Sequence, residues 1–101
     1  MENKQIIEKI LTDTKALMTL KVDNEEVVKD KFRLIKDRVE ELYSAAGEGR
    51  DHYLNAFTLI QAAMDTDYRQ FSESTSHTEK EQALIQLRHK AAEVCEILQS
   101  A

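Results

Sequence analysis

Proline and tryptophan are absent from this sequence of 101 residues, and Gly47 and Gly49 are its only glycines. Tight turns between strands draw on Gly, Pro and Asn-Gly or Asp-Gly pairs, so a chain with many strands is disfavoured. The same shortage excludes phosphate-binding glycine loops and the nucleophile elbow, since both need several glycines in a short motif. We therefore expect an all-α fold.

Cysteine is also scarce, because Cys95 is the only one in the sequence. A lone cysteine cannot build a disulfide framework, which is typical of a reducing compartment or of a secreted helical protein that needs no disulfides. The first residues lack the features of a classical signal peptide, and no apolar run approaches the roughly 20 residues of a membrane span. We expect a soluble, cytoplasmic protein without a membrane partner.

Charge of one sign predominates, since charged residues make up 33% of the chain and the formal net charge is -5. An acidic protein is a poor partner for phosphate backbones and a better one for basic protein surfaces. The basic residues of the range 29–38 alternate with Asp30 and Asp37, a pattern typical of a solvated helix face with ion pairs. We expect another protein as the partner, with a basic surface favoured, and no nucleic acid.

Apolar residues recur with a period close to 3.6 in four segments, which indicates four amphipathic helices. We predict helices over about 3–20, 24–46, 50–72 and 78–99 within a single domain covering 1–101. Similar helix lengths and short connections favour an antiparallel up-down-up-down four-helix bundle. Completion or extension of the bundle by dimerisation, including a first helix that packs on a second chain, stays an alternative.

The second helix has clear start and stop signals. Asp23 and Glu26 have the spacing of a capping box, and Val22 and Val27 have the spacing of a hydrophobic staple. Gly47 follows the last apolar residue of this helix and can adopt the left-handed conformation that commonly ends helices. These signals predict a helix that starts just after Asp23 and stops before Gly47.

The start of the last helix has two alternative capping boxes in a stretch rich in serine and threonine. One pairs Ser76 with Glu79, and the other pairs Thr78 with Glu81. Both have the same spacing and the same residue types, so the sequence leaves the choice between them open.

The residues that could bind a metal or catalyse a reaction do not form a recognised motif. Metal sites in helical bundles use Glu-x-x-His, and no Glu here is followed by His at that spacing. The range 65–67 begins like a calcium loop, but the sixth position is Gln70, where such a loop needs glycine. In phosphotransfer domains a lysine and then a glycine usually follow the exposed histidine. Neither His52 nor His89 is followed by this lysine–glycine pattern. We expect no enzyme, no metal and no cofactor.

One stretch carries less charge than a solvent-facing helix normally does. The range 52–64 contains no formal charge when histidine is neutral, and other apolar residues lie off the main stripes of their helices. We predict a candidate interaction surface formed by Val27, Leu34, Ala56, Leu59, Ala62, Ala63 and Ile85. The alternative is that the third helix is simply the most enclosed one and that scattered apolar surface residues need no explanation.

Together these features predict a non-enzymatic helical module for protein–protein interaction, such as an adaptor, chaperone, inhibitor or immunity-type protein. An exported helical-hairpin secretion substrate is an alternative, although such proteins carry Trp-x-Gly at their turn and this chain has no tryptophan. A phosphotransfer domain is a weaker alternative that rests on analogy of fold alone.

If the off-stripe apolar residues mediate self-association, sedimentation at micromolar concentration will show a dimer or a larger species. Leu34→Glu and Leu59→Glu should shift it towards the monomer, because each places a charge in an apolar contact. A protein that is monomeric before and after both substitutions, with unchanged melting, would contradict self-association through this surface.

Overall fold

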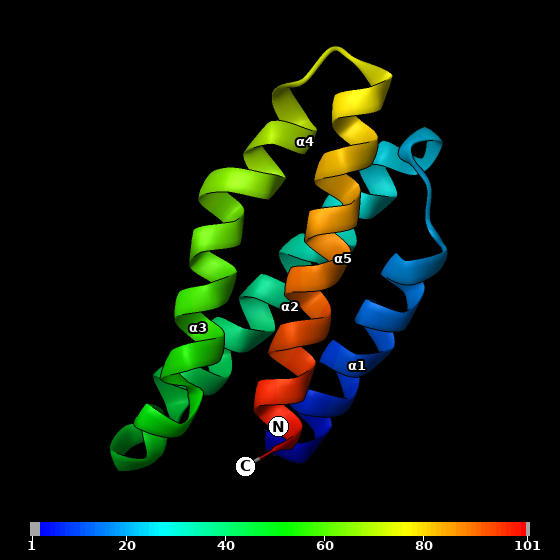
Figure 1. Ribbon diagram of the computed structural model, residues 1–101. Coiled ribbons are helices and arrows are strands. Elements are labelled where there is room, and N and C mark those ends of the chain that lie inside the picture. Colours follow the sequence, from blue (N-terminus) through cyan, green and yellow to red (C-terminus); the bar gives the residue numbers. More distant parts are fainter. Residues whose placement is uncertain (1–2, 101) are drawn as a thin grey trace.

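Four helical segments joined by short connections form the chain in a computed structural model, which describes residues 3–100 (Figure 1). The elements are α1 (Asn3–Thr19), α2 (Glu25–Ala45), α3 (Asp51–Ala63), α4 (Arg69–Glu73) and α5 (His77–Gln99). A π-helical turn, Met64–Tyr68, joins α3 to α4 without a break, so these three elements make one segment. No strand occurs between residues 3 and 100, which confirms the all-α class.

The four segments begin and end within one residue of the ranges expected from the sequence. Residues 1, 2 and 101 of the predicted domain lie outside the described residues. No helix in the described part of the chain is both long enough and apolar enough to cross a membrane.

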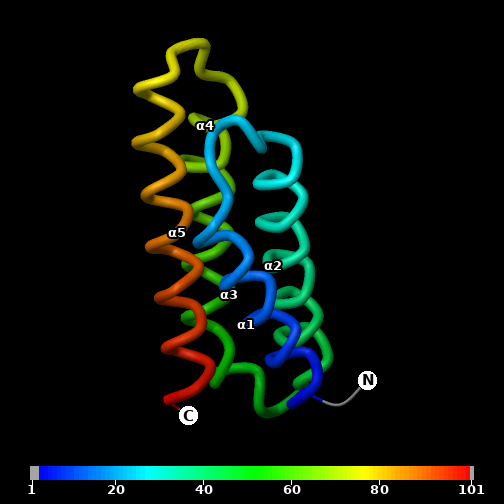
Figure 2. Tube along the Cα trace, turned by 90° about the vertical axis from the view of Figure 1, so that its right-hand side faces the viewer, coloured from blue at the N-terminus to red at the C-terminus, as the bar shows by residue number. Residues whose placement is uncertain are grey.

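Each segment packs on two neighbours around one apolar core. In Figure 2, α1 lies between α5 and α2, while α3 contacts both α2 and α5 behind it. α1 begins and α5 ends at the same end of a molecule that measures 44 × 21 × 19 Å. The largest fully buried side chains come from all four segments and include Ile10, Leu17, Phe32, Ile35, Ile60, Phe71 and Leu87.

The π-helical turn is a feature that apolar periodicity did not reveal. The apolar residues Met64, Tyr68 and Phe71 have spacings of four and three across this turn, which a regular α-helix also shows. Within this turn the Thr66 hydroxyl donates a hydrogen bond to the Ala62 carbonyl at 2.9 Å. The Tyr68 ring stacks on Phe32 with the ring centroids 6.1 Å apart, and α4 then buries Phe71 completely.

The start of α2 differs from the predicted capping box. A 3-10 turn over Val22–Asn24 precedes the helix, and the Asn24 side-chain oxygen accepts a hydrogen bond from the Lys21 backbone N–H at 3.2 Å. α2 then begins at Glu25 without a side-chain cap, and Val27 is 44% exposed. The predicted Asp23 capping box and the staple on Val27 are therefore wrong. The cause is a competing local hydrogen bond made by Asn24.

Two other turn predictions agree with the structure. Gly47 has a φ of 57°, the left-handed conformation expected after the second helix. Ser76 decides the open choice at the start of α5, because its hydroxyl accepts a hydrogen bond from the Glu79 backbone N–H at 3.4 Å.

A buried carboxylate fixes α1 against α2. Asp13 is only 6% exposed and forms ion pairs with Lys31, at 3.6 Å, and with Arg38. Lys31 and Arg38 lie two turns apart on one face of α2, and both are partly buried. The alternation of charges over 29–38 predicts a solvated face, but Lys31 and Arg38 instead face α1. Because a buried charge is costly without its partners, this cluster specifies how α1 lies along α2.

Replacing Gly47 with alanine should lower the free energy of unfolding by about 1 kcal/mol, because L-residues are strained at positive φ. No atom lies within 4 Å of a Cβ added there, so the effect reports backbone strain alone. Gly49→Ala is the matched control, since Gly49 lacks both a positive φ and a close neighbour. Urea titrations that show equal effects for the two variants would contradict this assignment.

Asp13→Asn should destabilise the protein by about 2 kcal/mol, because Lys31 and Arg38 keep their charges and lose their carboxylate. This figure lies below the usual range for fully buried pairs, since both cations are partly exposed. Asp30→Asn is the control, because the Asp30–Arg33 pair is exposed and screened by solvent, so its loss should change stability far less. Thermal melts with similar losses for the two variants would show that the buried cluster is unimportant.

Candidate binding groove between α1 and α5

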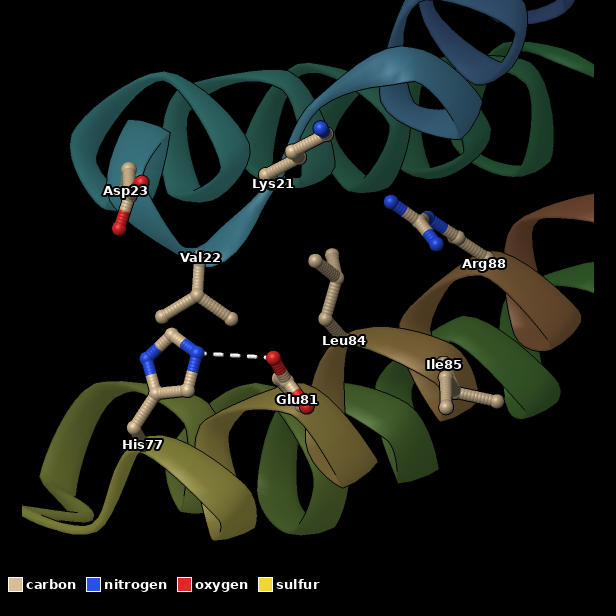
Figure 3. Close-up of a pocket in the computed structure, with 8 residues that line it drawn as sticks. All are labelled: Lys21, Val22, Asp23, His77, Glu81, Leu84, Ile85 and Arg88. Atoms are coloured by element: carbon tan, nitrogen blue, oxygen red, sulfur yellow. Dashed lines mark hydrogen bonds and ion pairs between the residues drawn. The ribbon is translucent and has the colours of Figure 1, made fainter.

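Two adjoining pockets share Ile85 and Arg88: the first lies between α5 and the connection that follows α1, and the second lies between α5 and the end of α1. The first has a volume of about 320 Å³ and is lined by Lys21, Val22, Asp23, His77, Glu81, Leu84, Ile85 and Arg88 (Figure 3). The second has a volume of about 290 Å³ and is lined by Met18, Ile85, Arg88, His89 and Ala92. We call the surface formed by these residues the α1/α5 groove.

Arg88 reaches from α5 to the end of α1 and is the central polar residue of the groove. Its Nε donates a hydrogen bond to the Leu17 carbonyl at 3.4 Å, and a terminal guanidinium nitrogen donates to the Leu20 carbonyl. The last carbonyl groups of a helix lack partners within the helix and carry the negative end of its dipole. Arg88 therefore acts as a cap for α1, and this contact holds the last turn of α1 beside α5.

The first pocket has mixed charge. His77 and Glu81 lie one turn apart on α5, with His77 Nε2 and Glu81 Oε1 2.8 Å apart. Figure 3 shows Val22 pointing from the 3-10 turn towards this pair, with Asp23 beside it. Lys21 lies on the same connection. Both signs are thus present at this end of the groove.

The second pocket combines exposed apolar side chains with positive charge. Met18 is 41% exposed and Ile85 is 48% exposed, although both side chains are large and apolar. The polar residues that line this pocket are Arg88 and His89, and no acidic residue lines it. This part of an acidic protein therefore presents an apolar surface bordered by the Arg88 guanidinium and the His89 imidazole.

Three residues of the predicted interaction surface are exposed large apolar residues. Val27 and Leu34 lie seven residues apart on α2 and are 44% and 39% exposed, and Ile85 lies in the groove. In Figure 2, α1 lies between α2 and α5. The two pockets that contain Ile85 include neither Val27 nor Leu34 among their lining residues.

The four predicted surface residues on α3 have different outcomes. Ala56 and Ala63 are 0% and 1% exposed, so assigning them to an exposed surface is wrong. The reason is that α3 packs against both α2 and α5, and small residues at these contacts allow close approach within the chain. Leu59 is partly buried and packs on the core, whereas Ala62 is exposed.

Sequence reasoning missed Met18 and Arg88 as groove residues. Met18 belongs to the apolar stripe of the first helix, which suggested burial, and Arg88 resembles any charged residue beside a core stripe. Ile85 is the groove residue whose exposure the sequence did predict, because it lies off the main apolar stripe of the last helix.

The remaining candidate groups for chemistry are separated or shielded. Among residues 3–100, no group of three or more His, Cys, Asp or Glu is placed to hold a metal ion. Cys95 is 7% exposed, and its burial raises the pKa of its thiol, although its hydrogen bond to Thr14 at 3.3 Å acts in the opposite direction. The raised pKa disfavours the nucleophilic thiolate. His52 is exposed and packs edge-on against Tyr53, with ring centroids 4.9 Å apart.

Comparisons with known protein families, with curated proteins and with solved structures found no match for this chain. Met18 and Ile85 are the apolar side chains of the groove that remain exposed.

Proposed function

We propose that this protein is a non-enzymatic helical module that binds another protein, and that the α1/α5 groove is the binding site. The observation that carries this proposal is the joint exposure of Met18 and Ile85 in one pocket. Large apolar residues that are exposed together on a recessed surface are typical of protein interaction sites. Lys21, Arg88 and His89 supply the polar rim that such interfaces normally have.

We also propose an antiparallel up-down-up-down four-helix bundle as the scaffold. Contacts between consecutive segments support this arrangement, as do the contact of α1 with α5 and the short connections at 20–24, 46–50 and 74–76. In this topology α1 and α5 are adjacent helices without a connection between them. A partner can therefore lie along the α1/α5 groove without meeting a loop that joins these two helices.

The chemistry of the groove favours binding over catalysis. Arg88 caps α1, and Glu81 lies within hydrogen-bond distance of His77, so the polar groups are held by contacts within the protein. The thiol of Cys95 is buried and its pKa is raised, which fits a structural side chain. We place the protein in a reducing compartment such as the cytoplasm, and the free thiol supports this location.

The net charge of -5 favours a partner with a basic surface during approach, because long-range steering follows the overall charge. Self-association through exposed apolar residues stays a prediction, for which sedimentation is the test. The leading proposal remains a different protein as partner, because like-charged copies of this chain repel each other.

Site-specific photo-crosslinking in the source cell tests this function. p-Benzoylphenylalanine in place of Met18 and in place of Ile85 should give the same discrete protein adduct, because both residues line one pocket. The matched control is Gln86, an exposed neighbour of Ile85 that lines neither pocket. We expect the adduct at position 86 to be at least about tenfold weaker.

Equal adducts at positions 85 and 86, or none at 18 and 85, would contradict binding at the groove. A phosphoryl mass increase at His89 or His52 on incubation with a phosphodonor would instead favour the phosphotransfer alternative.

A further inference from the structure

We propose that α1 exchanges between two copies of this chain, so that each copy holds the α1 of the other in a domain-swapped dimer. The connection at 20–24 straightens in this exchange, and α1 and α2 of each chain join into one continuous helix. The exchange itself is independent of the proposed function. Only its effect on the α1/α5 groove rests on that function.

The apolar residues of α1 and α2 are in phase for one continuous helix. Val28 follows Leu17 by eleven positions, which is three helical turns plus about 20°. Within one chain, each apolar stripe needs only to face the core, whereas a continuous helix also needs the two stripes in phase. On such a helix the buried apolar residues of both elements fall within an arc of about 80°, and they are Ile6, Ile10, Leu17, Val28, Phe32, Ile35, Val39 and Leu42.

The connection between α1 and α2 carries no residue that prevents a continuous helix. It spans residues 20–24, and it contains neither the glycine nor the proline that interrupts helices. Its 3-10 turn, Val22–Asn24, has no buried residue. The Asn24 backbone N–H donates to the Lys21 carbonyl at 2.9 Å, and the Asn24 side chain accepts from the Lys21 N–H at 3.2 Å. Regular helical hydrogen bonds can replace these local ones, so straightening loses little.

The site that α1 occupies favours a second copy of α1 over an unrelated helix. Asp13 pairs with Lys31 and Arg38 of α2, and the Thr14 hydroxyl accepts a hydrogen bond from Cys95 of α5 at 3.3 Å. The α1 of any copy carries these groups in the same positions. A helix without the carboxylate would leave two partly buried cations unpaired.

Concentration and salt determine the balance between the monomer and the exchanged dimer. The dimer keeps the contacts of α1 and gains helical hydrogen bonds at 20–24, but two chains lose their independent motion. Two copies with a net charge of -5 also repel each other, and salt screens this repulsion. We expect a monomer in dilute solution and an increasing share of dimer at high protein and salt concentrations.

Exchange changes the α1/α5 groove in a defined way. Residues 21–23 line the first pocket because the connection folds back there, so straightening the connection removes this pocket. The second pocket is rebuilt with Met18 from one copy and Ile85 from the other. Partner binding at the groove therefore becomes sensitive to the concentration of the protein itself.

Two substitutions in the connection test the exchange in opposite directions, by light scattering after refolding at equal protein concentration. Asn24→Ala removes a hydrogen bond of the turn and raises helix propensity, so the dimer association constant should rise at least about tenfold. Val22→Pro should abolish the dimer, because proline fits the first position of the turn and breaks a continuous helix. Lys21 already has the extended backbone that precedes proline, with φ -118° and ψ 172°. Asn55→Ala, at an exposed position of α3, is the matched control and should change nothing.

Charge-reversed copies distinguish exchange from other kinds of dimer. One variant carries Asp13→Lys, and the other carries both Lys31→Glu and Arg38→Glu, so each alone has like charges where α1 meets α2. After joint refolding the two variants should form a one-to-one dimer that melts at a higher temperature than either variant alone. Each α1 then meets opposite charges on the other copy, which a chain that keeps its own α1 does not achieve.

These experiments separate exchange from association through exposed surfaces. A dimer that persists in Val22→Pro, or one that Leu34→Glu abolishes, would overturn the inference. Asn24→Ala that stays monomeric at high protein and salt concentrations would overturn it too, as would mixed charge variants that melt no higher than each alone. The photo-crosslinks at 18 and 85 test the proposed function separately, so either proposal can fail while the other stands.

Discussion

The carbonyl groups at the end of α1 are the constraint on which the groove depends. α1 ends at Thr19, and the chain then enters a short connection without glycine or proline. Carbonyl groups at such an end need donors: the Leu17 carbonyl accepts from the Leu20 backbone N–H at 3.3 Å, and Arg88 of α5 donates further hydrogen bonds to Leu17 and Leu20. The same contact brings Met18 and Ile85 to one pocket, so a structural requirement of α1 also creates the surface that we assign to binding.

Asp13 and Lys80 are further charged side chains that link one helical segment to another. Asp13 joins α1 to two cations of α2, while Lys80 of α5 donates to the Phe71 carbonyl at 2.7 Å and pairs with Glu25 at 2.8 Å. Each of these side chains links two or more helical segments through charge. Apolar stripes determine which faces are buried, and these few polar contacts determine how the segments are aligned along one another.

Much of the fold could be predicted from the sequence because apolar periodicity reports directly which residues face a core. The helix ranges and the left-handed Gly47 follow from properties of single segments. The start of α2 could not be predicted, because Asp23 matches the capping motif while Asn24 makes the hydrogen bond that forms the turn. The π-helical turn at Met64–Tyr68 could not be predicted, because the spacings of four and three between Met64, Tyr68 and Phe71 also fit a regular α-helix.

Less of the candidate site could be predicted, since a position around a helix axis does not say which neighbour covers it. Ala56 and Ala63 are small enough to accept either a helix of the same chain or a partner, and here their own chain covers them. Met18 shows the reverse case, because it lies in an apolar stripe and yet is partly exposed. The exposure of Ile85 could be predicted, because its position around the helix axis lies far from the apolar stripe of the last helix.

The thiol of Cys95 has a consequence for measuring motion in this protein. It is buried and donates to Thr14 of α1 at 3.3 Å, so it lies at the contact between α1 and α5. A water-soluble alkylating reagent can reach it only when these helices separate, and local separation of this kind has its own free energy. The rate at which the Cys95 thiol is labelled therefore measures how often α1 and α5 separate.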